Sequence, residues 1–301
     1  MICAFDIGGS KIAAATPISG DPARLKPLGE VPTPTQDFDG FCAALAALLP
    51  AGTHRAGVSV AGVIGPEGDR LSSANIPCIH GRALARELTE RLGLPVDVIN
   101  DANAFGLAES VLGCGAGHRV VFAAILGTGI GGAVVIDGRV HEGRAGTAGE
   151  WGHGPASAAD AAALPRLPCG CGQTGCVDTL GGARGLERLH HHLYGRSATS
   201  HEILSGWHAG DPAAGHTLGL YLDVVGGALA AAANLIDPSI VPVGGGLGQD
   251  ARLVAALDAE VRARMIAPSD APLLRQASLQ PHAGLIGAAI HAGRCGDDRN
   301  A

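Results

Sequence analysis

The sequence predicts an α/β protein organised in two halves. Short apolar segments with the length of strands alternate with longer segments in which apolar residues recur at helical spacing. An apolar strand that runs into a glycine turn and resumes as a second strand occurs twice, at Gly8-Gly9 and at Gly127-Thr128-Gly129. A third apolar strand also ends in glycines, at Gly244-Gly245-Gly246. The repetition of one plan in two parts of the chain indicates two halves of related construction.

Size and charge exclude several classes of protein. The 301 residues are enough for one large domain or two modest ones without disulfide support. No apolar run reaches the roughly 18 uncharged residues of a membrane helix, and the chain starts without the basic segment and cleavage site of a secretory signal. We therefore expect a soluble cytoplasmic protein with no membrane partner. The formal net charge is -7 and no run of lysine and arginine occurs, so we expect no nucleic-acid partner.

The first glycine turn has the features of a phosphate-binding loop. It follows an apolar strand over Ile2–Ile7 and precedes a second strand over Ile12–Thr16. Backbone N–H groups of the turn and the hydroxyl of Ser10 can hold an anion, and Lys11 adds a positive charge beside it. Asp6 stands at the end of the first strand, where a carboxylate can hold Mg²⁺ through water. The competing interpretation is a plain glycine hairpin.

The segment between the two turns alternates helices and strands and ends in polar residues. Asn100 and Asp101 directly follow a buried strand, and polar side chains at the carboxyl end of a strand lie where open α/β sheets bind ligands. The alternative is that Asp101 caps the next helix. The expected elements are a helix over Phe38–Leu49 behind the cap Asp37, a strand over Ala56–Val60, a helix over Ala83–Leu92, a strand over Val96–Ile99 and a helix over Ala102–Leu112.

The second and third glycine turns favour a nucleotide. A strand over Val120–Leu126 enters the second turn, a strand over Ala133–Ile136 leaves it, and Asp137-Gly138 predicts a hairpin beyond it. The third strand, Ile240–Val243, ends in three glycines whose missing side chains would let a flat ring lie against the backbone. Each turn alone is weak support. Three strands that end in glycine turns fit phosphate and nucleoside binding better than three unrelated loops do.

A cluster of cysteines behind a histidine predicts a structural zinc site. His153, Cys169, Cys171 and Cys176 form a complete tetrahedral ligand set of one imidazole and three thiolates. Four disulfides among the eight cysteines are the alternative, but a chain of this size without an export signal favours thiolate ligation. The other five cysteines are expected to be buried free thiols: Cys3, Cys42, Cys78, Cys114 and Cys295.

The rest of the second half is predicted to be mainly helical. His190, His191 and His192 are successive residues that do not share one helix face, so we interpret them as solvated rather than metal-binding. The expected helices are Ala183–Tyr194, Ser200–Ala209, Ala213–Ile236, Ala251–Met265 and Gly284–Gly293, and the tail 297–301 is expected to fray.

With these motifs in hand, the chain resembles the ROK family of sugar kinases over nearly its whole length, and within it the bacterial N-acetylglucosamine kinases. DIGGSK at 6–11 is similar to the first phosphate motif of the family, and LGTGIGG at 126–132 to the second. EWGH at 150–153 followed by CGCGQTGC at 169–176 matches the zinc signature, the most specific of these motifs. ANIP at 74–77 and NDAN at 100–103 resemble sugar-binding segments.

The resemblance implies an actin-like (ribonuclease H-like) α/β fold of two domains, with ATP and sugar in a cleft between them. It implies a small domain over 1–117 plus 287–301, a large domain over 118–286, and a homodimer. Asp101 matches the catalytic base that accepts the proton of the sugar 6-hydroxyl as that oxygen attacks the γ-phosphate of ATP, with Mg²⁺ and the glycine turns stabilising charge. The implied sugar-binding positions are Gly62, Asn75, Asn100, Asp101, Glu150, His153 and Asp178.

His153 can serve both sites, because one ring nitrogen can bind zinc while the other meets a sugar hydroxyl. Asp178 is a departure from the family, which usually has Glu there, and its carboxylate is one methylene shorter. The expected substrate is N-acetylglucosamine, and glucose, fructose and N-acetylmannosamine are the alternatives.

Two functions without catalysis are also considered. Regulators of this family carry a helix-turn-helix before the first glycine turn, and Asp6 stands almost at the start of this sequence, which leaves no room for that module. A sugar-binding protein without catalysis is the second, and it predicts that Asp101→Asn would leave function and binding intact.

Overall fold

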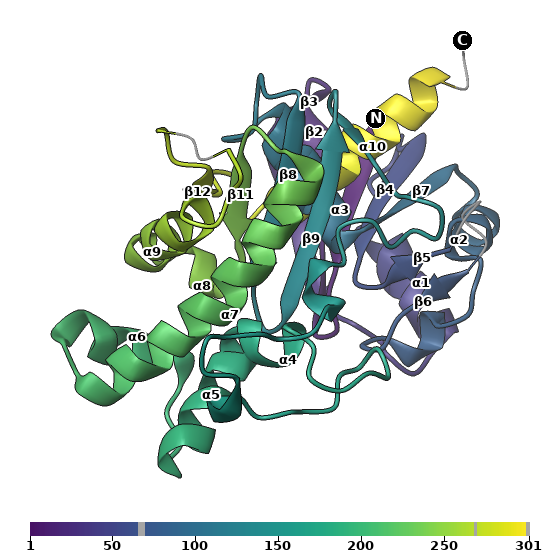
Figure 1. Cartoon of the computed structure of the whole chain (residues 1–301). Coiled ribbons are helices and arrows are strands. Elements are labelled where there is room, and N and C mark those ends of the chain that lie inside the picture. The colour runs from purple at the N-terminus through teal and green to yellow at the C-terminus, as the bar shows by residue number, and fades with distance from the viewer. Residues whose placement is uncertain (66–69, 268–269, 299–301) are drawn as a thin grey trace. The chain divides into compact units, whose positions relative to one another are not determined.

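The computed structural model describes residues 1–65, 70–267 and 270–298 (Figure 1). The chain forms two compact units. Unit 1 comprises Met1–Ala116, Ala133–Ala148 and Leu279–Ala301, and unit 2 comprises Gly117–Gly132 and Gly149–Ser278. The domain limits implied by the resemblance differ from this division mainly in residues 133–148 and 279–286, which belong to unit 1.

Unit 1 is built on a mixed sheet with the strand order β3-β2-β1-β4-β7. The hairpin of β1 and β2 and the pair of β2 and β3 are antiparallel, whereas β4 runs parallel to both β1 and β7. A short antiparallel pair, β5 and β6, lies outside this sheet. The bounds are β1 Ile2–Ile7, β2 Lys11–Ile18, β3 Asp21–Pro32, β4 Arg55–Val60, β5 Val63–Ile64, β6 Leu71–Ser72 and β7 Val96–Asn100.

Side chains of β1 alternate between two layers of helices. Phe5 and its odd-numbered neighbours pack in a buried cluster with α1 and α2, while Ala4 packs with α10 in a second cluster. Asp6 has the same parity as Ala4, which places it on the α10 side of the strand. Helix α3 packs against α10. The bounds are α1 Phe38–Leu48, the 3₁₀ helix η2 Pro77–Ile79, α2 Leu84–Leu92, α3 Asp101–Val111 and α10 Ala283–Asp298.

Glycines let α10 approach its neighbours closely. A Cβ atom on Gly57 of β4 would clash with the carbonyl oxygen of Ala288, and one on Gly287 would clash with that of Ala104 in α3. With larger side chains at these contacts, α10 would have to lie farther from β4 and α3. The abundance of alanine and glycine in the sequence is therefore used to bring the last helix against the sheet.

Unit 2 contains the parallel strands β8, β11 and β12 and most of the helices. β11 pairs with β8 and with β12, so the glycines that follow β8 and β11 lie at the same edge. β9 carries the chain from unit 2 into unit 1, where its end pairs with β10. The bounds are β8 Val120–Leu126, β9 Ile130–Ile136, β10 Arg139–Val140, η3 Trp151–His153, η4 Ala161–Ala163, α4 Asp178–Gly181, α5 Ala183–Tyr194, α6 Ser200–Ala209, α7 Pro212–Ile236, β11 Val241–Gly244, α8 Gly245–Gly248, α9 Ala251–Arg262 and β12 Leu274–Gln276.

Helix α7 is the one helix among the described residues that is long and apolar enough to cross a membrane. It packs against α5, α6 and α9, and its buried residues include Tyr221, whose hydroxyl donates a hydrogen bond to the carbonyl of Gly181 at 2.7 Å. A helix that packs among other helices of a folded unit passes the same test of length and composition, and α7 packs in this way.

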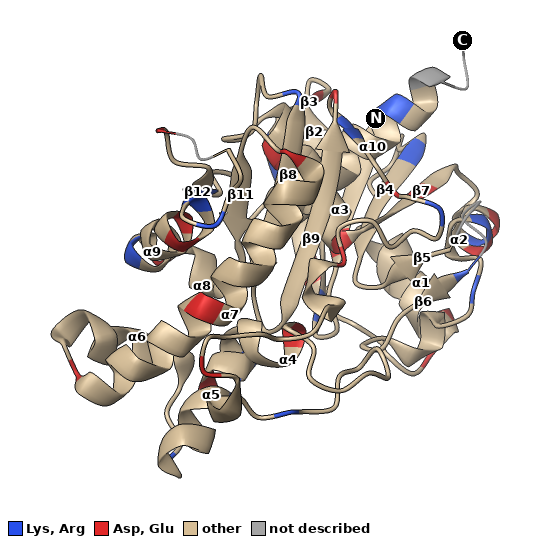
Figure 2. Ribbon diagram, viewed as in Figure 1, with Lys and Arg blue, Asp and Glu red and all other residues tan. Residues whose placement is uncertain are grey.

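Charged side chains are mixed rather than gathered by sign. Figure 2 shows Lys and Arg beside Asp and Glu on α2 and α9. Arg82, which precedes α2, pairs with Glu87 of that helix at 2.6 Å, and at the end of the helix Arg91 pairs with Asp39 of α1 at 2.7 Å. This distribution agrees with the net charge of -7 in giving no basic stripe on these elements.

The predicted elements are confirmed with shifts of a few residues at their ends, and two of the helices, α5 and α6, have the predicted bounds. The predicted cap of α1 is also confirmed, because Asp37 accepts a hydrogen bond from the N–H of Asp39 at 3.0 Å. At the predicted hairpin turn, Asp137 and Gly138 both have positive φ, as a tight turn between twisted strands requires. The tail is partly helical, since α10 continues to Asp298, and residues 299–301 lie outside the described part of the chain.

Candidate functional site

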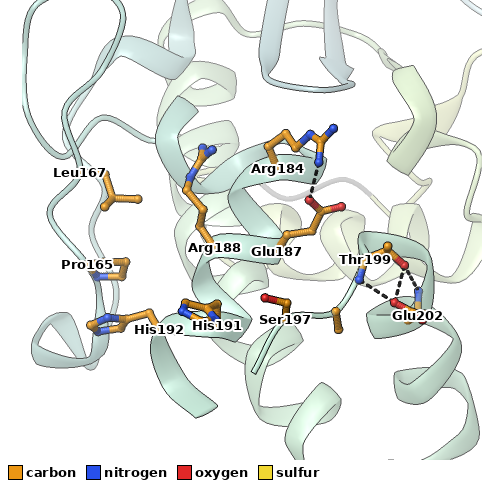
Figure 3. A pocket seen from close by; sticks show the side chains of 11 residues that line it. Pro165, Leu167, Arg184, Glu187, Arg188, His191, His192, Ser197, Thr199 and Glu202 are labelled. Carbon is orange, nitrogen blue, oxygen red and sulfur yellow. Dashed lines mark hydrogen bonds and ion pairs between the residues drawn. The ribbon is translucent and has the colours of Figure 1, made fainter. Parts of the chain in front are cut away.

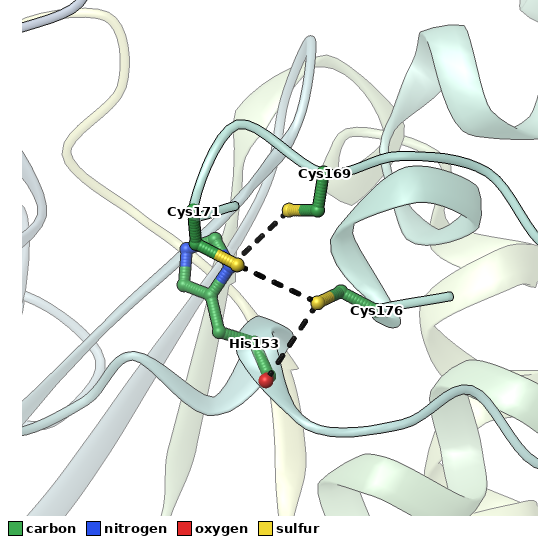
Figure 4. Close-up of side chains that lie close together, drawn as sticks. All are labelled: His153, Cys169, Cys171 and Cys176. Carbon is green, nitrogen blue, oxygen red and sulfur yellow. Dashed lines mark hydrogen bonds between the residues drawn. The ribbon is translucent and has the colours of Figure 1, made fainter. Parts of the chain in front are cut away.

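Four side chains of unit 2 come together in the arrangement of a metal site (Figure 4). One nitrogen of His153 and the Sγ atoms of Cys169, Cys171 and Cys176 all lie within 4.8 Å of one another. Sγ of Cys169 is 3.5 Å from Nδ1 of His153, and the Sγ atoms of Cys171 and Cys176 are 3.6 Å apart. Zinc bonds of about 2.0 to 2.3 Å in a tetrahedron place ligand atoms about 3.5 to 3.8 Å apart. The arrangement fits a zinc ion held by three thiolates and one imidazole.

Hydrogen bonds and glycines fold the segment from Cys169 to Cys176 into a tight loop. The N–H of Cys169 donates to the carbonyl of Gln173 at 2.8 Å, and the N–H of Gly172 donates back to the carbonyl of Cys169 at 3.0 Å. Gly172 has a φ of 88°, which glycine adopts without strain. The backbone N–H of Gln173 also stabilises the thiolate of Cys171 and lowers its pKa to about 7. This thiol therefore ionises more readily at neutral pH than an ordinary cysteine, and the thiolate is the form that binds metal.

Glu150 supports the imidazole from the side opposite the thiolates. Nε2 of His153 lies 3.3 Å from Oε2 of Glu150, while Nδ1 faces Cys169. A carboxylate at the far nitrogen of a metal-binding histidine fixes its tautomer and ring orientation. The expected contact of this second nitrogen with a sugar hydroxyl would have to be shared with Glu150.

In unit 1, Asp101 is the first residue of α3, and Asn100 caps the helix. Oδ1 of Asn100 accepts the N–H of Asn103 at 3.0 Å, and its Nδ2 donates to the carbonyl of Gly62 at 2.8 Å and to Oδ1 of Asp101 at 3.1 Å. The alternative that Asp101 caps the helix is wrong. The cap is Asn100, because its side chain accepts the N–H of Asn103 and Asp101 is already the first helical residue. Asp101 is therefore free of the capping role.

Gly62 could not be another residue without moving the chain. Its φ is 144°, and a Cβ atom there would lie 2.6 Å from the carbonyl oxygen of Ser72. Its own carbonyl receives the amide of Asn100. Gly62 therefore ties the end of β4 to the residue that precedes Asp101.

Asp6 lies in unit 1 with Asp101, and the charge of Asp101 affects the pKa of Asp6. The hydroxyl of Ser59, a fully buried residue of β4, donates to Oδ1 of Asp6 at 2.9 Å. Desolvation raises the pKa of the Asp6 carboxyl, the bond from Ser59 opposes the rise, and the negative charge of Asp101 adds to it. Desolvation likewise raises the pKa of Asp101, against the opposing hydrogen bond from the N–H of Ala102. Two carboxylates disfavoured in this way are stabilised by a cation such as Mg²⁺.

The first glycine turn lies beside Asn75 in unit 1. The N–H of Gly8 donates to the carbonyl of Lys11 at 3.0 Å, and a Cβ atom on Gly9 would be 3.4 Å from the carbonyl oxygen of Asn75. The ammonium of Lys11 is directed to Glu30, with Nζ 2.7 Å from Oε1, and both side chains are more than half exposed. Lys11 would have to leave this exposed pair, which contributes little to stability, to approach a phosphate.

The second and third glycine turns meet in unit 2. In the parallel pairing of β8 and β11, Gly244 lies opposite Ile125. Gly245 has a φ of 84°, and a Cβ atom there would lie 2.6 Å from the backbone nitrogen of Gly127. Only glycine allows both the left-handed backbone and this close approach.

These turns line one side of a cavity of about 790 Å³ in unit 2. Gly127, Thr128 and Gly246 contribute to it, and α6 supplies an opposite polar wall that includes Ser205 and His208. Nε2 of His208 lies 3.0 Å from Asp250, which also lines the cavity. The volume falls in the range of small-molecule sites, about 300 to 1,000 Å³.

The family model described as ROK family matches residues 2–294. The chain belongs to the ROK family. Among curated relatives, the N-acetylgalactosamine kinase AgaK of Shewanella sp. (strain ANA-3) is 35% identical over 298 residues, covering 96% of each chain. The N-acetyl-D-glucosamine kinase of Pectobacterium atrosepticum is 33% identical over 302 residues, covering 96% of this chain and 98% of the relative.

Solved ROK structures share the fold over the whole chain. The ROK hexokinase from Thermus thermophilus has a TM-score of 0.85 and 33% identity, and 99% of each chain is covered. The ROK family glucokinase from Streptomyces griseus, solved in complex with glucose and AMPPNP, has a TM-score of 0.78 and 28% identity, covering 97% of this chain and 99% of that one. The expected actin-like α/β fold is thereby confirmed.

The predicted site residues of this ROK protein fall into two groups, one in each unit. Those of unit 1 lie along the first glycine turn and the ends of β4 and β7. Those of unit 2 lie at the ends of β8 and β11 and at the zinc-ligand cluster, which consists of His153, Cys169, Cys171 and Cys176. The unit 1 group is Asp6, Gly8, Gly9, Ser10, Lys11, Gly62, Asn75, Asn100 and Asp101; the unit 2 group is Gly127, Thr128, Gly129, Glu150, His153, Cys169, Cys171, Cys176, Asp178, Gly244, Gly245 and Gly246.

Sequence reasoning missed two residues that shape the position of Asp6. Ser59 lies within an apolar strand, where a hydroxyl signals a buried polar partner. Gly284 of α10 lies against the carboxylate, since a Cβ atom there would be 2.5 Å from Oδ1 of Asp6. No local signal marks that contact, because it joins opposite ends of the chain.

A second cavity of unit 2, about 730 Å³, lies between α5 and the start of α6 (Figure 3). Arg184, His191 and His192 line it, and both histidines are exposed as expected. The expectation is wrong for His190, which is 5% exposed and has Nδ1 2.8 Å from the hydroxyl of Thr217. Adjacent helix positions point in different directions, so one member of the run faces the core.

Proposed function

We propose that this protein transfers the γ-phosphate of ATP to the 6-hydroxyl of N-acetylglucosamine. The observation that carries the proposal is the relationship over nearly the whole chain to kinases named for N-acetylhexosamines, at 35% and 33% identity. N-acetylgalactosamine is the second candidate because it is the substrate named for the relative from Shewanella. The two sugars share the acetamido group and the 6-hydroxyl and differ in the orientation of the 4-hydroxyl.

The chemistry proposed for unit 1 rests on its two carboxylates. Asp101 accepts the proton of the 6-hydroxyl while that oxygen attacks phosphorus, a contribution typically worth about 10² to 10⁴ in rate. Its desolvated environment supports this role, because a raised pKa makes the carboxylate a stronger base. Asp6 would hold Mg²⁺, and the cation would offset the charge that develops on the phosphates. Asn75, Asn100 and the backbone at Gly62 are proposed to contact the sugar.

Unit 2 is proposed to hold the nucleotide. The turns at Gly127-Thr128-Gly129 and Gly244-Gly245-Gly246 offer backbone N–H groups and one hydroxyl, the donors that stabilise phosphate charge. The cavity of about 790 Å³ beside Gly246 supports a place for the nucleoside, because glycines there leave the backbone open to a flat ring.

Zinc is proposed as a structural ion of unit 2. His153, Cys169, Cys171 and Cys176 would hold it, and the closed set of four protein ligands leaves no open position for substrate. When bound, the ion ties the loop together without taking part in bond making. Glu150 and His153 then present oriented polar groups to a sugar. A cytoplasmic location and a homodimer are further parts of the proposal, and they rest on family membership.

The proposal is tested by measuring ADP release with a panel of sugars. We expect N-acetylglucosamine to give the highest kcat/KM, N-acetylgalactosamine to follow, and glucose, fructose and N-acetylmannosamine to react more slowly. Asp101→Asn should reduce kcat with every sugar by about 10² to 10⁴. The absence of turnover with every hexose and N-acetylhexosamine would contradict the kinase function, and a preference for glucose would contradict the proposed substrate.

A further inference from the structure

The carboxylate of Asp178 touches both the second glycine turn and the zinc-ligand cluster. Asp178 begins α4, two residues beyond Cys176. Its Oδ1 accepts the N–H of Ile130 at 2.8 Å, and Ile130 is the residue that ends the turn at Gly127-Thr128-Gly129. Its Oδ2 lies 3.8 Å from Sγ of Cys169. Both oxygens therefore face groups of unit 2 itself.

The backbone around Asp178 is packed closely against the same turn. A Cβ atom on Gly129 would lie 2.8 Å from Oδ1 of Asp178, and one on Gly182 would lie 2.5 Å from Cα of Gly129. The N–H of Ala183 donates to the carbonyl of Gly127 at 2.8 Å. The segment that follows the zinc-ligand loop thus binds the turn at both ends. The side chain of Asp178 accepts the N–H of Ile130, and the backbone N–H of Ala183 donates to Gly127.

The length of the side chain decides which group the carboxylate reaches. Where this chain has Asp, its resemblance to the family leads one to expect Glu, which is longer by one methylene. Oδ1 of Asp178 fills the space next to Gly129. The shorter side chain therefore places this oxygen within hydrogen-bond distance of the N–H of Ile130. A hydrogen bond between a carboxylate and an N–H group is stronger than one between neutral groups.

We propose that Asp178 is a positioning residue that fastens the nucleotide-binding turn to the zinc-ligand loop. It acts on the nucleotide through the turn at residues 127–130. The inference rests on the proposed function, which gives this turn the phosphates of ATP. It makes zinc and nucleotide cooperative, because Asp178 begins α4 two residues beyond the zinc ligand Cys176, so that a change in the loop is passed to the turn.

Binding measurements on Asp178→Ala and Asp178→Asn test the proposal without requiring turnover. We expect Asp178→Ala to weaken ADP binding about tenfold in calorimetry, the scale of one lost hydrogen bond to a charged group, and to leave sugar affinity unchanged. Asparagine keeps an oxygen that can accept the N–H of Ile130, so Asp178→Asn should retain most of the ADP affinity. Asp223→Ala is the control for the loss of a carboxylate that accepts a backbone N–H, since Asp223 accepts that of Ala159 at 2.6 Å and in addition pairs with Arg264 at 2.7 Å.

Hydrogen exchange separates this inference from the proposed function. In Asp178→Ala, amides of residues 127–131 should exchange faster than in the wild type, and zinc should leave faster when a chelator is added. Exchange that is unchanged in this segment, or a loss of sugar affinity with ADP affinity intact, would overturn the positioning role. If the wild type binds no nucleotide, the proposed function falls, while the exchange of residues 127–131 still decides whether Asp178 holds the turn.

Discussion

Replacing Gly284 with alanine tests whether the position of the Asp6 carboxylate limits catalysis. Gly284 is the second residue of α10, and the carboxylate of Asp6 lies against it. A Cβ atom at position 284 would be 2.5 Å from Oδ1, 2.6 Å from Cγ and 2.7 Å from Oδ2 of Asp6. The added methyl group would therefore press on the whole carboxylate rather than on one edge of it.

The expected displacement follows from these distances. Real Cβ atoms are essentially never closer than 3.0 Å to another group, so the carboxylate or the helix must shift by about 0.5 Å or more. The hydrogen bond from Ser59 to Oδ1 opposes rotation of the carboxylate. Misplacing a reactive group by 1 Å can cost about 10² in rate, so we expect kcat to fall about ten- to a hundredfold. Overpacking typically costs about 1 to 3 kcal/mol of stability.

Steady-state kinetics over a range of Mg²⁺ concentrations, together with thermal unfolding, provide the assay. Gly293→Ala in the same helix is the control, because the nearest atom to its new Cβ, Cδ1 of Ile2, would be at an ordinary 3.8 Å. That variant should keep kcat and gain up to about 1 kcal/mol of stability from the better helix propensity of alanine. Wild-type kcat and Mg²⁺ dependence in Gly284→Ala would refute the argument that the backbone of α10 sets the position of Asp6.

Three further predictions concern Asp101 and the zinc-ligand cluster. The raised pKa of Asp101 should shift the acid limb of kcat/KM above the usual pKa of aspartate, about 3.9, with activity lost as pH falls through it; a limb at the usual value would contradict the desolvation argument. A carboxyl whose pKa is raised by folding lowers the folding stability of the protein as pH rises through that pKa. Asp101→Asn should therefore increase the melting temperature at pH 7 while it reduces kcat, and a lower melting temperature would count against this. Glu150→Gln should speed zinc loss to a chelator about 10- to 100-fold, and His153→Ala should weaken both zinc retention and sugar binding; unchanged zinc release in either variant would show that the pair of Glu150 and His153 does not support the metal.

Elements with strong local patterns could be predicted from the sequence, whereas β3 could not. The strand Asp21–Pro32 contains Pro22, Pro27 and Pro32 and few buried side chains, so it has neither the apolar content nor the residue types of a strand. It forms because it lies at the edge of the sheet and pairs only with β2, where proline is tolerated. Its existence depends on a neighbour rather than on its own sequence.

The candidate metal-ligand cluster could be predicted because four uncommon side chains occur within 24 residues, from His153 to Cys176, and chemistry leaves them few other roles. The partners of individual site residues could not. Lys11 faces Glu30, and Asp178 faces Ile130, which is 48 residues away in sequence. Such contacts are set by how strands and loops pack, and no local pattern encodes them. The same limit explains why the burial of His190 was missed.

Product analysis of the reaction with N-acetylglucosamine and ATP tests the central claim most directly. Phosphorus NMR of the product, with wild type and Asp101→Asn measured in parallel, reports both the position of the phosphate and the residue that makes its transfer fast. The account predicts a phosphate monoester at carbon 6, formed by the wild type, slowed at least about 10² by Asp101→Asn, and absent with the 6-deoxy sugar. A phosphate at another position, or equal rates for the two proteins, would contradict it.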